Sequence, residues 1–316
     1  MREDAIALSS HPLRRIPGVA VMLALLVGGF ALLAPGFASA ANLSNILVQS
    51  TVLLMLALPM TLIIMTEGLD LSMGAVLTLT SLVVAIVSLA TGSVALGLLA
   101  AVAVGFGFGC LNGWLVAGVG IPPFVATLGT LGMAQGLCLI VSDGQSVVGI
   151  PHGVRDVYSG TFAGIPIPIV LALASYAAFH ALLYHTRFGT YIFALGGNRE
   201  ALSYAGRSPR ALLVAVYALG GAMVGVAGLL MTARMNAGHP TAGLGLEFDA
   251  IAAVAVGGTS FEGGDGWLLG TALGVVAVGV LRNGLNLMAV PSSVQVASVG
   301  VLVIVALFLD GLRSRP

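Results

Sequence analysis

The sequence predicts an all-α polytopic membrane protein with about ten transmembrane helices. Hydrophobic residues make up 58% of its 316 residues, charged residues only 8%, and the mean hydropathy is +1.08. Soluble globular domains are typically about 45–50% apolar and about 25% charged. A bilayer accommodates so much apolar surface, because lipid is the solvent for the outward-facing side chains of a spanning helix.

The apolar residues are grouped in stretches of the length that a bilayer requires, about 20 residues for a helix. Ten stretches reach or approach this length, at residues 16–36, 46–65, 71–90, 94–117, 123–141, 165–184, 211–233, 247–260, 266–287 and 293–310. The eighth is short and predicts a half-helix or a re-entrant segment, so the count lies between eight and ten. We expect a tail at residues 1–15 and one transmembrane domain at residues 16–312.

The first stretch has two interpretations. It follows Arg14 and Arg15 and precedes Ala38-Ser39-Ala40, a pattern that resembles a signal peptide with its cleavage site. However, the apolar run exceeds the usual length of about 7–15 residues for such a segment. We therefore interpret it as the first transmembrane helix.

Arginine clusters predict the orientation, because cytoplasmic loops of membrane proteins carry an excess of basic residues. The clusters lie at residues 14–15, 187–210 and 313–315, and an even number of predicted spans separates each from the next. We therefore expect both termini and the segment 185–210 in the cytoplasm, and the segment 143–164 outside. Arg155, in that external segment, is a mild exception.

An internal repeat accompanies these spans. A shift of 171 residues aligns residues 98–131 with residues 269–302, and ten of the 34 positions are identical. Asn112-Gly113 aligns with Asn283-Gly284. The repeat pairs the fourth span with the ninth and the fifth with the tenth. Since five spans is an odd number, the two halves would have opposite orientations, as in the inverted repeats of many transporters.

The composition also excludes several classes of function. The chain has no lysine, so it has no phosphate-binding P-loop, which requires one, and we expect no ATP hydrolysis by this chain. A formal net charge of zero argues against nucleic acid as a partner. No grouping of His, Cys, Asp and Glu has the spacing of a metal site, and Cys110 and Cys138 both lie in apolar spans, where we expect small buried side chains.

Two polar patches interrupt the apolar stretches. The segment from Glu67 to Ser72 reads as a tight turn in which Asp70 or Ser72 caps the third span, in preference to a charged site in a wet cavity. The second patch combines residues 236–240 with residues 247–249. It fits equally well an external loop with a capped short helix and an external mouth that meets a partner or a substrate.

Uncharged polar side chains also lie in or near the spans. A neutral polyhydroxylated solute would need such donors and acceptors along its path, but interhelical hydrogen bonds are the favoured interpretation. These residues are Asn112, Gln135, Asn283, Asn286 and Gln295. Gly105, Gly109 and Gly113, together with Gly221 and Gly225, predict close helix packing through small-residue faces.

The expected cytoplasmic segment contains a short helix with its own start and stop signals. Asn198 is a suitable N-cap, Glu200 suits the positive N-terminal end, and Gly206 can end the helix. A helix of about two turns is unstable alone. We therefore expect it to lie across the membrane face and to dock into a groove on another protein.

The chain resembles the ribose-type permeases, the membrane subunits of bacterial ABC sugar importers. The resemblance covers residues 20 to 312 and rests on several stretches in matching order and spacing, namely Gly68–Gly74, Asn112–Leu131, Arg187–Gly206, Glu247–Gly266 and Leu285–Gln295. It implies a type II-like importer in the bacterial inner membrane. The sequence departs from the family pattern around Leu137–Gly164, which leaves the sugar open among ribose-, xylose- and galactose-like monosaccharides.

The resemblance further implies partners and sites. A second permease subunit, identical or related, completes the pathway, a periplasmic sugar-binding protein delivers the sugar, and a cytoplasmic ATPase holds ATP and magnesium, so this chain needs no cofactor. The residues assigned to coupling with the ATPase are Asn198, Arg199, Glu200, Ala201, Ser203 and Gly206. The candidate pathway or gate residues are Asp70, Ser72, Asn112, Asn283, Asn286 and Gln295.

Two alternatives belong to other classes. An ion-coupled secondary transporter of a small polar solute would be expected to place a buried carboxylate or a charged pair in the middle of a span. The sequence gives none, because its acidic residues cluster near the predicted span ends. A membrane-embedded enzyme would require a cluster of His, Asp or Glu at one interface, and the sequence offers none.

Overall fold

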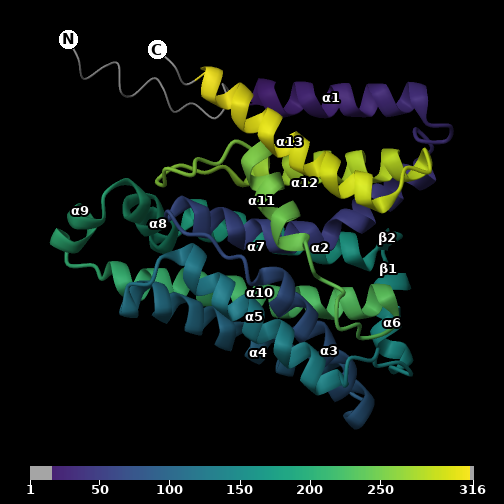
Figure 1. The fold of residues 1–316 in the computed structure, drawn as a ribbon, viewed down its shortest axis with the longest axis horizontal. Helices are drawn as coiled ribbons and strands as arrows, with labels where there is room; N and C mark the ends of the chain where they lie inside the picture. Colours follow the sequence, from purple (N-terminus) through teal and green to yellow (C-terminus); the bar gives the residue numbers. More distant parts are fainter. Residues whose placement is uncertain (1–15, 314–316) are drawn as a thin grey trace.

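The computed structural model describes residues 16–313, apart from the side chains of residues 16, 17, 303 and 305–313. The predicted tail at residues 1–15, with Arg14 and Arg15, and Arg315 lie outside the described residues. The described chain is mostly helical (Figure 1), with elements α1 (Ile16–Leu33), α2 (Ala40–Met65), α3 (Met73–Thr91), α4 (Val94–Trp114), the π-helical turn η2 (Leu115–Val119), α5 (Pro123–Ser142), α6 (His152–Ser159), β1 (Thr161–Phe162), β2 (Ile165–Pro166), α7 (Ile167–His185), α8 (Arg187–Gly197), α9 (Arg199–Tyr204), α10 (Pro209–Met235), α11 (Leu246–Val256), α12 (Leu268–Leu287) and α13 (Ser292–Arg313).

Each of the ten predicted stretches coincides with a helix. Within the described part of the chain, seven helices are long and apolar enough to cross a membrane: α2, α3, α4 with η2, α5, α7, α10 and α12. The prediction of a mostly helical, polytopic membrane protein is therefore confirmed. α11 has 11 residues and is about 16 Å long, too short for a hydrocarbon core of about 30 Å.

Three local features differ from the sequence prediction. α2 begins at Ala40 rather than at residue 46, because Ser39 Oγ accepts a hydrogen bond from the amide of Asn42 (3.3 Å) and starts the helix in a polar turn that hydropathy does not detect. The segment 143–164 contains α6 and β1, and β1 forms an antiparallel hairpin with β2 just after this segment, so the protein is not purely helical. α8 precedes the expected short helix and was not predicted.

The helices pack in two groups that meet at α2 and α10. α10 packs against α3 and α4, whereas α2 packs against α11 and α12, and α2 and α10 contact each other. Figure 1 shows α1, α12 and α13 along one edge of the molecule and α3, α4 and α5 along the other. α8 and α9 lie at one end, and α6, β1 and β2 lie at the opposite end.

The predicted glycine faces form the contact between α4 and α10. A Cβ atom on Gly105 would collide with the carbonyl of Gly221, and one on Gly225 would lie 2.6 Å from the carbonyl of Ala101. The same holds for Gly109 against the carbonyl of Tyr217. Since only glycine lets the two backbones approach so closely, the prediction of close helix packing is confirmed.

The outer helices present apolar faces. α2 and α3 are mostly buried within the chain, whereas less than a third of the span residues of α4, α5 and α7 is buried. On α5, Phe124, Leu128 and Met133 are each about half exposed. A contiguous apolar face of this kind suits lipid or another membrane subunit.

Candidate functional site

The segment from α8 to α10 forms a capped, compact projection at one end of the molecule. Asn198 Oδ1 accepts a hydrogen bond from the amide of Ala201 (2.9 Å) and caps α9, as predicted. At the other end Gly206 has φ +74°, its amide bonds to the carbonyl of Ser203, and the amide of Arg207 bonds to the carbonyl of Leu202. This is a Schellman C-cap, in which the left-handed position favours glycine, so the predicted start and stop of the short helix are confirmed.

The side chains of α9 divide into an inner and an outer set. Leu202 is buried and attaches the helix to the rest of the chain, whereas Glu200, Ala201 and Ser203 are exposed. Tyr204 is 87% exposed. Tyr204 is not among the predicted coupling residues, although an exposed aromatic side chain among small residues is typical of an interface anchor.

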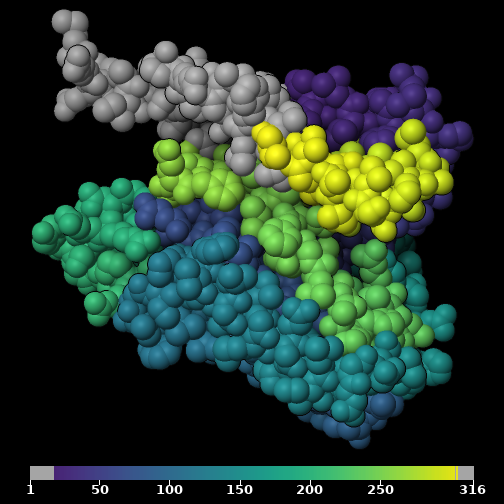
Figure 2. Space-filling view, viewed as in Figure 1, coloured from purple at the N-terminus to yellow at the C-terminus, as the bar shows by residue number. Residues whose placement is uncertain are grey.

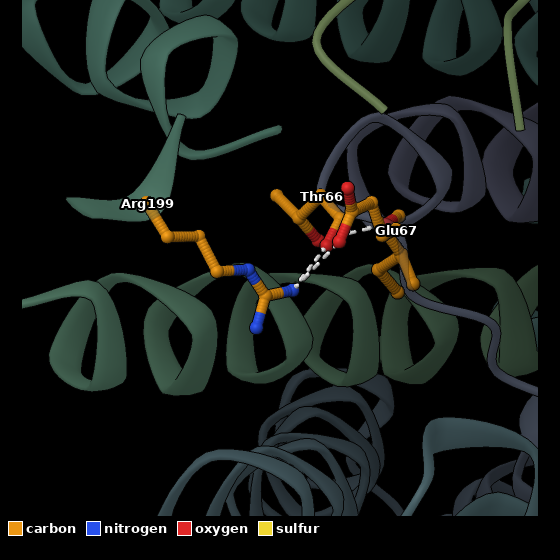
Figure 3. Close-up of polar contacts among 4 residues, drawn as sticks. Thr66, Glu67 and Arg199 are labelled. Atoms are coloured by element: carbon orange, nitrogen blue, oxygen red, sulfur yellow. Dashed lines mark hydrogen bonds and ion pairs between the residues drawn. The ribbon is translucent and has the colours of Figure 1, made fainter. Parts of the chain in front are cut away.

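Arg199 belongs to neither set, because its side chain turns back toward the transmembrane helices (Figure 3). Its Nη2 donates a hydrogen bond to the carbonyl of Thr66 (3.0 Å) and lies 3.5 Å from Glu67 Oε2. Thr66 caps the C-terminal end of α2. Arg199 therefore joins the first residue of α9 to the end of the most central helix of the chain.

The end of α2 has an unusual backbone conformation. Glu67 has φ +61°, although the left-handed region is unfavourable by roughly 1–2 kcal/mol for a residue with a side chain. The amide of Gly68 then reaches the carbonyl of Ile63 (3.0 Å) and closes the helix. The sequence therefore places a strained glutamate where glycine is usual, and its carboxylate is the group that faces Arg199.

A third segment meets the same point. The amide of Gly264, in the loop between α11 and α12, donates a hydrogen bond to the carbonyl of Met65 (2.8 Å). A Cβ atom on Gly196 would collide with the carbonyl of Met65 and the amide of Gly264. The C-terminal end of α8, the end of α2 and the α11–α12 loop are thus in backbone contact, and we call this meeting point the coupling junction.

α8 could have been found from the sequence. Thr186 Oγ1 accepts a hydrogen bond from the amide of Gly189 (3.3 Å) and caps it, while Ile192 and Leu195 are buried. Phe188, Ile192 and Leu195 follow the apolar spacing of a helix with one buried face. The basic and glycine-rich composition of the segment concealed this pattern.

Three of the predicted pathway residues form one buried network. Asp70 Oδ1 accepts hydrogen bonds from the amide (2.9 Å) and the hydroxyl (2.6 Å) of Ser72. Asn112 Nδ2 donates to Ser72 Oγ (2.9 Å) and to both Asp70 oxygens, and Asn112 Oδ1 accepts from Thr130 (2.6 Å). The network joins the turn before α3 to α4 and α5, beside a void of about 10 Å³. This confirms the turn, with Ser72 at the N-cap of α3 but without a side-chain cap of its own.

Burial has the largest effect on the pKa of the Asp70 carboxyl group. Its residue is 3% exposed, and burial raises the pKa of the carboxyl above its ordinary value. The hydrogen bonds from Ser72 and Asn112 favour the charged form and oppose this shift. A buried carboxyl with three donors is a structural hub, and its partners determine how well the charge is tolerated.

The other three predicted pathway residues are separate from this network. Asn283 and Asn42 exchange two hydrogen bonds (2.9 and 3.0 Å) and join α12 to α2, which is the interhelical bond expected of such residues. Gln295 donates to the carbonyl of Val290 (2.9 Å), and Asn286 is exposed. The structure therefore does not bring the six residues together.

A cavity of about 710 Å³ lies elsewhere, between α2, α10, α11, α12 and α13, and none of the six predicted pathway residues lines it. Asp249 of α11 and Arg282 of α12 do line it, and Arg282 Nη2 donates to Asp249 Oδ1 (2.7 Å). The pairing was not predicted, and it does not lie in the middle of a span, because Asp249 is near the start of the predicted stretch 247–260 and Arg282 is toward the end of its own stretch. Arg282 falls inside the predicted stretch 266–287, and a charge inside a span is itself a signal for a functional site.

The second polar patch supports both of its interpretations. Asn236 ends α10 in the left-handed region (φ +52°), and Glu247 Oε2 accepts the amide of Gly245 (3.0 Å) at the start of α11. Gly245 and Phe248 also line the cavity. At the same end Val147 and Gly238 form a β-bridge, which fastens the segment 143–164 to the α10–α11 loop.

Among the described residues, no group of three or more His, Cys, Asp and Glu side chains could hold a metal ion. Cys138 is buried, as expected, whereas Cys110 is only half-buried.

Known proteins match nearly the whole chain. The family described as branched-chain amino acid transport system / permease component matches residues 42–307. The ribose import permease protein RbsC of Bacillus subtilis strain 168 is 36% identical, over 90% of this chain and 88% of its own length. The D-allose transport system permease protein AlsC of Escherichia coli K12 is 36% identical, over 94% and 92%. The L-arabinose ABC transporter permease protein AraH of Azospirillum brasilense is 30% identical, over 94% and 88%.

No solved structure matches the chain significantly. The family match covers α2 to α12 and much of α13, and includes the coupling junction, the buried network and the cavity. The chain therefore belongs to the family of permease components of branched-chain amino acid transport systems.

Proposed function

We propose that this chain is the transmembrane permease subunit of an ATP-driven, binding-protein-dependent importer of a monosaccharide. The observation that carries the proposal is the near full-length identity of 36% to relatives named as ribose and D-allose permeases. The membrane-spanning helices supply the translocation pathway, and ATP hydrolysis resides on a partner. An ion-coupled transporter is the less favoured candidate, since the 30% identical relative AraH is named as an ABC transporter permease.

The proposal assigns a cytoplasmic ATPase to the end of the molecule that holds α9. The exposed side chains of Glu200, Ala201, Ser203 and Tyr204 provide its docking surface. Both termini then lie in the cytoplasm. The opposite end, with α6 and the β1–β2 hairpin, receives the periplasmic sugar-binding protein (Figure 1). A second permease subunit covers the exposed apolar face of α5.

We further propose ten membrane-inserted segments arranged as an inverted repeat. The packing supports this: α4 packs against α10 much as α12 packs against α2, and α3 contacts α10 as α11 contacts α2. The aligned asparagines support it too, because Asn112 and Asn283 each bond to a side chain outside their own helix. In this scheme α11 corresponds to α3, so α11 is the shortened member of the pair.

The contacts of the coupling junction support a route by which movement of α9 reaches the transmembrane helices. When ATP draws the ATPase domains together, α9 moves, and Arg199 passes that movement to Thr66 and Glu67 at the end of α2. The hydrogen bond between Gly264 and Met65 carries it to the α11–α12 loop. The assignment of Asp70, Asn112 and the other polar residues to a pathway or gate stays a prediction.

Reconstituted uptake tests the proposed function. Proteoliposomes would hold this chain with its ATPase and sugar-binding protein, and labelled D-ribose, D-allose and L-arabinose would be supplied with ATP inside. We expect uptake that needs all three components. Glu200→Arg should abolish it while the complex still assembles, and the conservative Glu200→Gln should retain most of it. Uptake driven by an ion gradient without the ATPase would contradict the proposal.

A further inference from the structure

The cavity of about 710 Å³ lies within a single chain, in the half of the bundle away from the coupling junction. Its walls come from the first half of α2, the end of α10, the start of α11, the later part of α12 and the start of α13. The residues that matter for its chemistry are Gln49, Arg234, Phe248, Asp249, Arg282 and Gly300. Figure 2 shows the green atoms of the α10–α11 region at the surface beside the yellow α13. A volume of this size is typical of small-molecule sites.

Two charged side chains in the cavity wall have spare hydrogen-bonding capacity. Asp249 is 5% exposed in its side chain, and Arg282 is 37% exposed. Arg282 Nη2 donates to Asp249 Oδ1 and lies 2.5 Å from Asp249 Oδ2, so both carboxylate oxygens contact the guanidinium, whereas Arg282 Nε is buried and has no hydrogen-bond partner. Buried polar atoms are rarely left without a partner, so this pair points to a ligand that supplies one.

The donor set identifies the chemistry of that ligand. A carboxylate accepts hydrogen bonds from hydroxyl groups, and a guanidinium donates to their oxygen atoms, so an adjacent pair suits two neighbouring hydroxyls. Gln49 offers an amide, and the exposed ring of Phe248 (59%) offers an apolar face for carbon-bound hydrogens. An anion would be repelled by Asp249 and a simple cation by Arg282, while an acyl chain would leave Arg282 Nε unpaired.

The cavity is closed toward the coupling junction. Between it and the α11–α12 loop, Thr61 and Thr271 share a hydrogen bond (2.7 Å) that joins α2 to α12. A Cβ atom on Gly270 or Gly274 would collide with the α11 end at the carbonyls of Gly257 and Ala253. A ligand in the cavity could therefore reach the cytoplasmic end only after α11 and α12 separate.

We propose that this cavity is a transient binding site for a neutral monosaccharide, with Asp249 and Arg282 bonded to neighbouring hydroxyls of the sugar. The proposal rests on the proposed function and places a sugar site inside each permease subunit. The sugar waits there until movement at the coupling junction parts α11 from α12. Binding is weak, because a transporter that holds its solute tightly releases it slowly.

Gly300 offers a way to fill the cavity without disturbing the fold. It lies on α13 in the cavity wall, and a Cβ atom there meets nothing within 4 Å. Gly107 on α4 is a matched control, because it is exposed, lines neither described cavity and also leaves its Cβ position open. Gly300→Phe therefore fills the site, Gly300→Ala leaves it open, and Gly107→Phe adds the same ring elsewhere.

Saturation-transfer NMR on the permease–ATPase complex in nanodiscs, without the binding protein, measures weak sugar binding directly. With D-ribose, D-allose and L-arabinose as probes, we expect transfer to at least one sugar. Gly300→Phe and Asp249→Ala should weaken it roughly tenfold or more, as expected for losing a polar site contact. Gly107→Phe and Gly300→Ala should match the wild type. The double variant Asp249→Asn with Arg282→Gln keeps the volume, stays folded by size exclusion, and should also lose transfer.

Three results would overturn the site. These are equal transfer in wild type and in folded Gly300→Phe, equal loss in Gly107→Phe, and saturation transfer from protein to lipid chains with none to any sugar. Vesicle uptake separates this outcome from failure of the proposed function. If the wild-type complex shows ATP-driven uptake but no saturation transfer to a sugar, the binding site is contradicted and the importer function is supported. Saturation transfer to a sugar without ATP-driven uptake would support the binding site and contradict the proposed importer function.

Discussion

The guanidinium of Arg199 lies 3.5 Å from the carboxylate of Glu67, and this ion pair joins the start of α9 to the residue just beyond the end of α2 (Figure 3). Both side chains are about half exposed, so the pair contributes only about 0–1 kcal/mol to folding. An interaction too weak to hold the fold, yet made by a strained glutamate, fits the transmission role that we propose for this contact.

Removal of Arg199 should therefore uncouple transport without unfolding the protein. We expect Arg199→Ala to reduce sugar uptake per ATP hydrolysed about fivefold or more, the range of a typical coupling free energy. Glu67→Gln should have a smaller effect, because the hydrogen bond to Thr66 remains. Uptake and ATPase rates measured on the same vesicles test this, with the exposed Arg210→Ala as control. Equal losses in Arg199→Ala and Arg210→Ala would contradict the assignment.

Tyr204 should be an anchor for the ATPase. Exposed tyrosines at the centre of an interface often cost about 2 kcal/mol or more when truncated. Tyr204→Ala should therefore weaken the affinity for the ATPase by more than tenfold. Titration of fluorescent ATPase onto the permease in nanodiscs measures the Kd. The control is Phe162→Ala, which is 68% exposed at the opposite end and should leave the Kd unchanged.

Asn112 should be important for stability. Its loss removes one donor from Asp70, the donor to Ser72 Oγ and the side-chain acceptor of Thr130, all of which are buried. Each unsatisfied buried group costs about 1–3 kcal/mol. We expect Asn112→Ala to lower the Tm of the purified permease clearly, while the exposed Asn286→Ala leaves it nearly unchanged. Similar Tm values for the two variants would show that the network contributes little.

Asp70 should make stability depend on pH. Because its folded pKa is raised, the folded state holds the proton more tightly than the unfolded state, whose pKa is about 3.9. The contribution of Asp70 to stability is therefore greatest below about pH 4 and is lost as the pH rises through the folded pKa. Asp70→Asn removes this titration. The difference in Tm between wild type and Asp70→Asn should thus shift against the wild type between pH 4 and the folded pKa, and a difference that is constant with pH would refute this.

The contact between α4 and α10 should not tolerate side chains. Gly109→Leu forces a side chain into the backbone of Tyr217 and Ala218, and overpacking of this kind costs about 1–3 kcal/mol or more. Gly107→Leu, two residues earlier on the exposed face, should be tolerated. The yield and the Tm of the two variants in detergent measure this difference in stability. Equal values for Gly109→Leu and Gly107→Leu would contradict the described packing of α4 on α10.

Hydropathy and helix-capping residues alone determined the positions of many helices in this protein. The apolar stretches located ten helices, and Asn198 and Gly206 fixed α9, because spans and caps depend on residues close together in the chain. The glycine spacing that includes Gly105 and Gly221 predicted the close contact between α4 and α10 for a similar reason, since only small side chains permit it.

Tertiary structure decided which distant residues meet. Asp249 and Arg282 are 33 residues apart, and Arg199 and Thr66 are 133 apart, so no local pattern pairs them. The six polar residues chosen as pathway candidates share a chemical type, but burial separated them into a structural network, a helix pair and two single residues. The cavity is lined by residues of five helices that are far apart in the sequence, so only their packing determines its position.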